Sequence, residues 1–425
     1  MVMNFEVPPP VREKALKDPV RARADLLTQT MPVSGCEWLP LPAAAGRCLA
    51  EMQVAGMALP RFDNSAVDGF GIHRADMSGT MPRRLRIVAR IEAGDHPDIV
   101  DFKPGTSLRI RTGAAVPADL AAVIPEEAVK RDADSIIIAG PIVPGANIRR
   151  RGEDVAPGTE LLRPGVRLDP RHLALMAAAG IRRVQVVRQI RVGVLSTGNE
   201  LVEPGDAIAE GRIADSNRPM LLSALAHAGL EPVDLGIFSD KTEVLAQALR
   251  AAAPALDMLV TSGGVYGSEA DHLARALAMA GGTCTSLHLA LRPGKPMAFG
   301  KLGDMQVLGL PGNPVAALVH YVLFVRPVLA RLSGQQALAD SARTARTADV
   351  FRHKPGRTEM VPVKIVGHDE LALPLLEKLG RGGSARLLPL TQADGLAEMP
   401  AETGDMAAGV PIRFHPFTGL LAPGA

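Results

Sequence analysis

Apolar residues in the second half of the chain form short runs that alternate with amphipathic segments. Strands are predicted over residues 192–195, 233–238 and 258–261, and near Leu287 and Val307. Helices are predicted between and after them, over residues 217–229, 241–253, 270–280 and 314–332. Alternation at this spacing predicts a parallel sheet with helices on both faces.

The flanking regions show different patterns. Between about residues 52 and 154, short Val/Ile-rich runs are punctuated by Gly and Pro, which predicts a compact β module. A helix is predicted within residues 13–31, with a kink or a late start because of Pro19. A second helix is predicted over residues 171–179, ending at Gly180. The β-like runs 360–365 and 412–415 predict a small β domain at the end of the chain.

Composition narrows the class of protein. With 425 residues and 47% hydrophobic content, the chain is expected to be globular, with about three domains. Lys plus Arg (47) nearly balances Asp plus Glu (45), so no broad basic surface for nucleic acid is predicted. The 3 cysteines form no CxxC pair, which argues against a disulfide framework or a cysteine zinc site. Without a recognisable signal sequence or an uninterrupted apolar run of spanning length, we expect a cytoplasmic protein with no membrane association.

Candidate chemistry lies in the loops after the predicted strands, because ligands of open α/β sheets bind beyond the carboxyl ends of the strands. The first loop begins at Ser196 and offers hydroxyls, a glycine and the carboxylate of Glu200. The second, residues 261–272, has glycines that let backbone N–H groups converge on an anion. Its carboxylates, including Asp271, would repel a bare phosphate, which suggests an intervening cation such as Mg2+.

The third loop, residues 291–296, presents Arg292 and Lys295 on a proline-stiffened backbone, as an anionic ligand requires. Each loop taken alone is also compatible with an ordinary turn. The lysine does not complete a Walker A sequence, so P-loop hydrolysis is not predicted. Two N-terminal clusters, residues 61–71 and 147–154, combine acids with arginines, as a site for an anionic, metal-bridged ligand needs.

Seven motifs in this order resemble those of the MoeA family, the molybdopterin molybdenumtransferases. They are FDNSAVDGF at 62–70, RIRTGA at 109–114, NIRRRGEDV at 147–155, STGNEL at 196–201, SGGVYGSEAD at 262–271, RPGKP at 292–296 and LPGNPV at 310–315. The resemblance spans nearly the whole chain. It implies insertion of molybdate into adenylylated molybdopterin, with Mg2+-dependent release of AMP, to form molybdenum cofactor.

The resemblance also implies a multidomain fold of four domains rather than three. An extended N-terminal and connecting domain would comprise residues 1–58 and 158–190, with an inserted β domain at 59–157. A molybdopterin-binding α/β domain with a parallel-rich sheet would follow at 191–335, and a C-terminal β barrel at 336–425. Family members are similar in forming homodimers whose active site is shared between subunits.

Residue roles implied by the resemblance follow the motif positions. Catalytic roles fall to Asp68, Asp154, Glu200, Asp271 and Lys295, with Glu200 and Asp271 handling Mg2+. Substrate contacts fall to Thr112, Ser196, Thr197, Gly198, Ser262, Gly263, Gly264, Arg292, Pro311, Pro314 and Arg386. Within this set, Ser262, Gly263 and Gly264 would cradle phosphate, Lys295 would hold anionic charge near molybdate, and the two prolines would shape the pocket wall.

The sequence departs from the family pattern at Asn199, Arg292, His288, Ala316 and the stretch 266–268. One alternative is therefore a catalytically altered paralogue that binds or delivers molybdenum cofactor. Another is an adenylyltransferase built on the related α/β module, and a tungsten-selective transferase cannot be separated from the molybdate enzyme by these residues. Expected partners are a second copy of the chain, a molybdopterin adenylyltransferase and recipient molybdoenzymes.

Overall fold

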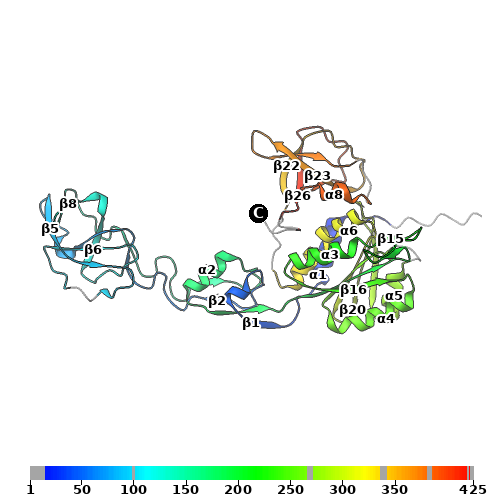
Figure 1. Cartoon of the computed structure of the whole chain (residues 1–425), viewed down its shortest axis with the longest axis horizontal. Helices are drawn as coiled ribbons and strands as arrows, with labels where there is room; N and C mark the ends of the chain where they lie inside the picture. The colour runs from blue at the N-terminus through cyan, green and yellow to red at the C-terminus, as the bar shows by residue number, and fades with distance from the viewer. Residues whose placement is uncertain are drawn as a thin grey trace, which may run out of the picture.

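The computed structural model describes residues 15–97, 101–265, 271–335, 342–380, 385–418 and 421. The molecule is elongated (Figure 1). A β domain lies at one end, a slender connecting module lies in the middle, and an α/β domain with a small β domain beside it lies at the other end.

The connecting module is built from two separate chain segments. Strand β1 (Cys36–Pro40) pairs with β12 (Arg183–Val187), and β2 (Gln53–Val54) pairs with β11 (Glu160–Leu162). Helix α2 (Pro170–Ala178) starts with a capping box at Asp169 and ends before Gly180, which has a φ of +79°. Helix α1 (Pro19–Gln29) starts late, with Pro19 in its first turn as expected, but its buried Ala22 and Leu26 join the core of the α/β domain.

The inserted β domain contains a 6-stranded sheet in the order β7-β4-β6-β5-β9-β8. The strands are β4 (Gly69–His73), β5 (Arg83–Ile91), β6 (Thr106–Ile110), β7 (Leu120–Pro125), β8 (Lys130–Asp132) and β9 (Ser135–Ile138). The short strands β3 (Asn64–Ser65) and β10 (Ile148–Arg149) pair at its base. This pairing brings the two charged N-terminal motifs together: Asp63 accepts hydrogen bonds from Arg150 Nη1 (2.7 Å) and from the Arg151 N–H (2.8 Å).

The α/β domain has a 6-stranded sheet in the order β16-β13-β17-β21-β20-β18. Its strands are β13 (Arg191–Thr197), β16 (Glu231–Phe238), β17 (Met258–Ser262), β18 (Thr283–His288), β20 (Pro296–Leu302) and β21 (Met305–Leu310). Strands β13, β16, β17 and β21 pair in parallel, as predicted, whereas β20 runs antiparallel to both of its neighbours, so the sheet is parallel-rich but mixed. The chain passes from β13 outward to β16 and then returns to β17 on the other side, which creates a topological switch point between β13 and β17.

Helices cover both faces of this sheet. One face packs against α1, α3 (Asn217–His227) and the long helix at 314–332, and the other packs against α4 (Thr242–Ala252) and α5 (His272–Ala280). Side chains alternate between the two cores, with Val192 and Val194 on one face and Leu195 on the other. A small two-stranded pairing, β14 (Leu201–Val202) with β15 (Ile213–Ala214), follows β13.

The long helix consists of α6 (Pro314–His320), a π-helical turn at Tyr321–Val325 and α7 (Arg326–Leu332). By length and composition, Pro314–Leu332 is apolar enough to cross a membrane, with a mean hydropathy of 1.6. Inside the fold, 83% of this window is buried, as is typical of a core helix.

The C-terminal domain is a closed five-strand β barrel. Its strands are β22 (Arg343–Thr347), β23 (Thr358–His368), β24 (Pro374–Lys378), β25 (Gly395–Met399) and β26 (Pro411–Pro416), with α8 (Leu387–Thr391) between β24 and β25. Strand β19 (Leu291–Arg292), which belongs to the α/β domain by sequence, pairs in parallel with β23 and joins the two domains.

Candidate active site

The carboxyl ends of β13, β17 and β21 lie side by side at the switch point. Ser196 is paired in register with Ser262, and Ser262 with Leu310, so the loops that follow begin at the same level. Ser196, Thr197 and Ser262 are all buried. The fold therefore brings together the STGNEL, SGG and LPGNPV motifs, which are far apart in the sequence.

Asn217, at the start of α3, connects two of these loops. Its buried side chain donates from Nδ2 to Ser262 Oγ and to the Gly312 carbonyl, at 2.7 Å in each case. An amide nitrogen carries two protons, so both are used. Sequence reasoning assigned Asn217 only to a helix start and missed this role, because the contact depends on the placement of three separate strands.

The glycines after β17 allow close approach of the β13 loop. A Cβ at Gly263 would lie 2.3 Å from the Thr197 carbonyl oxygen, and one at Gly264 would lie 2.7 Å from Thr197 Oγ1. Both glycines also have positive φ, +88° and +70°. The Gly263 N–H donates to the Leu310 carbonyl at 3.1 Å, so this N–H does not serve the predicted phosphate cradle. The lack of a side chain at Gly263 is required for packing between the loops.

Several buried polar atoms at these strand ends have no hydrogen-bond partner within the described part of the chain. They are Ser196 Oγ, Thr197 Oγ1, Thr261 Oγ1 and Asn217 Oδ1. Buried hydroxyls and amide oxygens are normally hydrogen-bonded, so such a group indicates a place where a polar ligand or water completes the bonding.

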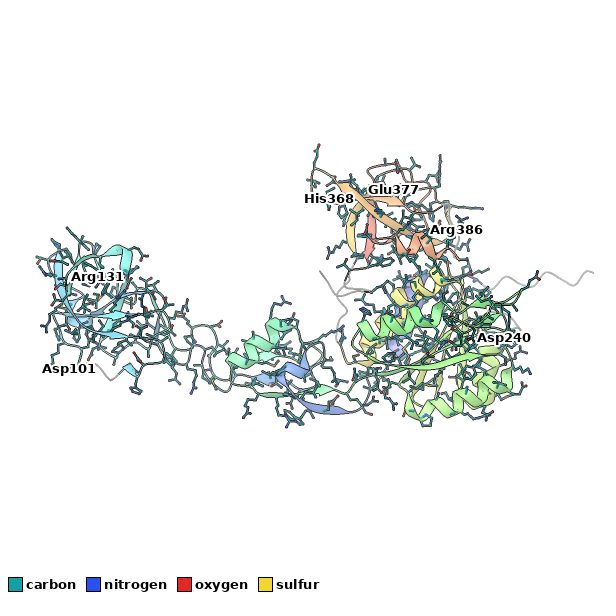
Figure 2. The ribbon with its side chains drawn as sticks, viewed as in Figure 1. Asp101, Arg131, Asp240, His368, Glu377 and Arg386 are labelled. Carbon is teal, nitrogen blue, oxygen red and sulfur yellow. The ribbon has the colours of Figure 1, made fainter. Side chains whose placement is uncertain are left out.

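Three carboxylates surround the strand ends. Asp271 is 3% exposed and caps α5, where Oδ1 accepts from the Ala274 N–H (3.2 Å) and Oδ2 accepts from Ser286 Oγ (2.6 Å). Glu200 is exposed, and a Cβ at Gly198 would lie 2.7 Å from its Oε2. Asp240, labelled in Figure 2, follows β16 and was missed by the sequence analysis.

Asp240 and Asn199 are joined by two hydrogen bonds, each from the backbone N–H of one residue to a side-chain oxygen of the other. The Asn199 N–H donates to Asp240 Oδ2, and the Asp240 N–H donates to Asn199 Oδ1, each at 3.3 Å. Asp240 Oδ1 is buried and has no partner among the described residues. Within those residues, no group of three or more His, Cys, Asp or Glu side chains has metal-binding geometry.

A cationic cleft opens between the α/β domain and the barrel, with an empty volume of about 1400 Å³ that includes open solvent. Arg292 and Lys295 line it from the α/β domain, as the sequence predicted. Arg357, Lys378 and Arg386 line it from the barrel. Arg386 directly precedes α8 on the barrel (Figure 2). Arg357 and Lys378 were not anticipated, because no motif indicates that β23 and β24 face this loop.

Glu359 provides a partial counter-charge in the cleft. Its carboxylate lies 3.8 Å from Arg292 Nη1 and 3.8 Å from Lys378 Nζ. Pro311 lines the cleft as predicted, whereas Pro314 is absent from the described lining and instead occupies the first turn of α6. Val265, just after the glycine loop, also lines the cleft and connects the strand ends with it.

The remaining predicted residues lie in or near the inserted β domain. Asp68 Oδ1 accepts from the Thr112 N–H and Oγ1, both at 2.8 Å, and Oδ2 accepts from Arg111 Nη1 at 2.5 Å. The Thr112 N–H is the largest cause of a lowered pKa for Asp68. Asp154 is exposed, and its N–H donates to the Leu59 carbonyl. Within one chain the connecting module separates this end from the α/β domain (Figure 1).

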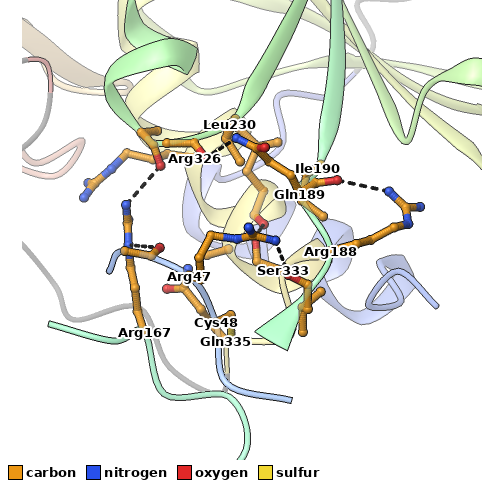
Figure 3. A pocket seen from close by; sticks show the side chains of 16 residues that line it. Arg47, Cys48, Arg167, Arg188, Gln189, Ile190, Leu230, Arg326, Ser333 and Gln335 are labelled. Atoms are coloured by element: carbon orange, nitrogen blue, oxygen red, sulfur yellow. Dashed lines mark hydrogen bonds between the residues drawn. The ribbon is translucent and has the colours of Figure 1, made fainter. Parts of the chain in front are cut away.

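A second pocket lies where the connecting module meets the α/β domain (Figure 3). Arg167 donates to the carbonyls of Gly46 (3.1 Å) and Ala228 (3.0 Å), which links the two bodies. Arg188 forms an ion pair with Asp257 at 2.5 Å. We assign these arginines to the attachment of the connecting module.

The fold and the strand-end site define a multidomain protein with an α/β domain, buried polar groups at its strand ends and a cationic cleft shared with a C-terminal barrel. Residues 18–180 match the family described as MoeA N-terminal region (domain I and II), residues 193–331 match a probable molybdopterin binding domain, and residues 344–417 match the MoeA C-terminal region (domain IV). The chain belongs to the MoeA family of transferases in molybdenum cofactor biosynthesis.

Relatives cover almost the whole chain. The molybdopterin molybdenumtransferase of Haemophilus influenzae is 34% identical over 403 residues, covering 94% of this chain and 98% of the relative. Molybdopterin molybdenumtransferase 2 of Mycobacterium tuberculosis is 33% identical over 415 residues, covering 95% and 100%. The crystal structure of the molybdopterin biosynthesis moeA protein from Pyrococcus horikoshii OT3 superposes with a TM-score of 0.77 at 27% identity, covering 94% and 99%.

Proposed function

We propose that this protein inserts molybdate into adenylylated molybdopterin and releases AMP, completing molybdenum cofactor. The observation that carries the proposal is that two chemically different parts of the site adjoin each other. Buried polar atoms and carboxylates lie at the strand ends, and the cations Arg292 and Lys295 lie in the adjoining cleft. An anhydride-linked nucleotide substrate fits the first place, and a small oxyanion fits the second.

The carboxylates suit a divalent cation that arrives with the substrate. Mg2+ is commonly held by one or two carboxylates together with phosphate oxygens and water, so a preformed cage of three protein ligands is not required. Asp240 Oδ1 is buried without a partner among the described residues, and Glu200 and Asp271 add hard oxygen donors at neighbouring strand ends. Mg2+ held there would neutralise charge on the phosphoanhydride as AMP leaves.

The protein side chains would then act by position and charge. Asn217 holds the loops of β17 and β21 together, which fixes Ser262 beside the ligand. Asp271 has both oxygens oriented by hydrogen bonds, so its carboxylate is pre-positioned. Arg292 and Lys295 would hold molybdate near the substrate sulfurs. Water can hydrolyse the anhydride without a protein nucleophile.

We also propose a homodimer in which Asp68, Thr112 and Asp154 of one subunit complete the site of the other. The support is the shape of the single chain, in which the connecting module holds the inserted β domain away from the α/β domain. Asp68 is fully hydrogen-bonded on an exposed surface, where a second copy can reach it.

The cellular setting follows from the same proposal. We place the protein in the cytoplasm, downstream of a molybdopterin adenylyltransferase and upstream of recipient molybdoenzymes. A delivery protein without catalysis is less well supported, because relatives matching 93–95% of the chain at 30–34% identity are named transferases.

The test is AMP release from adenylylated molybdopterin by the purified protein, with and without molybdate and Mg2+. The same mixtures would be used to reconstitute a cofactor-free molybdoenzyme. We expect AMP release and reconstitution when both ions are present. Tight binding of the substrate with neither result would favour the delivery protein, and ATP-dependent adenylylation of molybdopterin would favour the adenylyltransferase.

A further inference from the structure

His320, the last residue of α6, is fully buried against the loop that carries Arg292 and Lys295. Its Nε2 lies 2.9 Å from the Gly294 carbonyl oxygen. A Cβ at Gly294 would lie only 2.4 Å from the same nitrogen. The imidazole therefore occupies the space directly beside the middle of this loop, residues 291–296, which we call the cation loop.

The hydrogen bond fixes the tautomer of the neutral ring. Because a carbonyl can only accept, Nε2 carries the proton and Nδ1 is unprotonated. Nδ1 is buried and has no partner among the described residues. Burial lowers the pKa of His320 to about 4, so the ring is neutral near physiological pH and adds no charge next to Lys295.

The cation loop is attached to its surroundings on two other sides. The Leu289 N–H donates to the Lys295 carbonyl at 2.7 Å, which closes the loop. Leu291 and Arg292 pair with β23 of the barrel. The bond from His320 is therefore a side-chain link from the loop to α6, the helix that begins at Pro314 directly after the 311–313 loop.

We propose that His320 is a positioning residue that holds Gly294 so that Arg292 and Lys295 keep a fixed place relative to the 311–313 loop. The inference rests on the proposed function and names a determinant of its oxyanion affinity. His320 does not touch the oxyanion. It lowers the ordering cost of binding by keeping the two cations in place beforehand.

Three variants separate the effect of losing the hydrogen bond from the effect of disturbing the packing around it. His320→Phe removes the donor and keeps an aromatic ring, whereas His320→Gln keeps an N–H donor that can reach the same carbonyl. Phe324→Leu is the matched packing control, because the Phe324 ring is buried one turn further along and lies 5.3 Å from the imidazole. Its substitution disturbs the same helix without removing the bond.

The first readout is amide hydrogen exchange in residues 289–297 of the full-length protein. We expect faster exchange in His320→Phe and near-normal exchange in His320→Gln and Phe324→Leu. Unchanged loop exchange in folded His320→Phe overturns the proposal. If that variant fails to fold, Gly294→Ala pushes the loop away from the ring from the other side and is expected to loosen the same segment.

The second readout is the KM for molybdate in AMP release. Loss of one ordering hydrogen bond is expected to raise this KM about five- to tenfold in His320→Phe, with kcat changed less than about twofold and recovery in His320→Gln. Equal impairment in Phe324→Leu, or a loosened loop with unchanged KM, overturns the proposal. Absence of turnover in the wild type refutes the proposed function instead, while loop exchange still decides whether His320 holds Gly294.

Discussion

Asp271 and Asp68 are both carboxylates with each oxygen hydrogen-bonded, but they lie in very different surroundings. Asp271 is 3% exposed at the edge of a buried sheet, whereas the Asp68 side chain is 46% exposed on the inserted β domain. Burial and two hydrogen bonds fix the Asp271 carboxylate at the start of α5. Exposure leaves Asp68 on a surface that a second copy of the chain can reach, as the proposed homodimer requires.

The same difference separates the two ends of the molecule. The α/β end contains buried polar atoms without described partners and a cleft with cations on both walls. The β end contains satisfied, solvent-facing ion pairs such as Asp63 with Arg150 and Asp68 with Arg111. Substitutions at the α/β end should therefore affect chemistry and stability together. Under the proposed homodimer, those at the β end should affect the chemistry of the other subunit's site.

The largest effect is expected for Asp271→Ala. Loss of an oriented carboxylate should lower molybdate-dependent AMP release about 100-fold or more, and loss of the α5 cap should cost about 1 kcal/mol of unfolding free energy. Ser286→Ala removes only the hydroxyl bond to Oδ2 and serves as the control. Steady-state kinetics and thermal unfolding measure the two parts, and normal turnover in Asp271→Ala would remove this residue from the mechanism.

Asn217→Ala should have the next largest effect. The substitution leaves the Gly312 carbonyl and Ser262 Oγ without their shared donor, which should cost about 1–3 kcal/mol. Turnover should fall about tenfold because the two loops lose their alignment. Asn217→Asp is the same size but cannot donate, so denaturant unfolding and kinetics should place it with Asn217→Ala. If Asn217→Asp behaves like the wild type, the clamp is not what aligns the site.

Lys378→Ala tests the barrel wall of the cleft. Removal of a partly exposed cation should raise the KM for molybdate about two- to threefold and leave kcat nearly unchanged. Lys364→Ala, an exposed lysine on β23 that does not line the described cleft, should have no effect. Equal effects in the two variants would mean that general positive charge, and not the cleft, attracts the anion.

The smallest effect concerns the acid stability of the β end. Because the folded-state pKa of Asp68 is lowered, its hydrogen bonds stabilise the fold above the unfolded pKa of about 4, and this stabilisation is lost as the pH falls through the folded value. Asp68→Asn should lower Tm slightly at neutral pH, where the stabilisation by the carboxylate is fully present, and should flatten the dependence of Tm on pH below about pH 4. An identical pH dependence in both proteins would show that the Asp68 contacts do not persist in solution.

Local patterns predicted much of the α/β domain, because strand and helix periodicities there agree with the tertiary packing. The predicted strand 233–238 lies within β16, and the predicted helix 241–253 contains α4. Strand β20 was missed because Pro293, Gly294 and Pro296 indicate a turn, although the strand begins at Pro296 itself. In the barrel, β22, β24 and β25 are short segments that become recognisable only when the barrel closes.

Motifs that carry their own chemistry indicated Asp271, Arg292 and Lys295, and the structure places the first at the start of α5 and the other two in the cleft, while their roles stay predictions. Asn217, Asp240, Arg357 and Lys378 were not predictable, because their roles come from strand order and domain contact. Gly263 was assigned to phosphate binding, whereas its N–H is hydrogen-bonded to Leu310. Local sequence does not indicate which backbone donors the sheet itself will use.

The most direct test of the account is complementation between its two ends. Asp68→Ala and Asp271→Ala would each be purified as an inactive protein, mixed under conditions that allow subunit exchange, and assayed for molybdate-dependent AMP release. If each site combines residues of two subunits, random exchange should restore about a quarter of the wild-type activity, because half of the dimers are mixed and each mixed dimer has one intact site. No recovery despite proven exchange would contradict a site shared between the α/β domain and the inserted β domain.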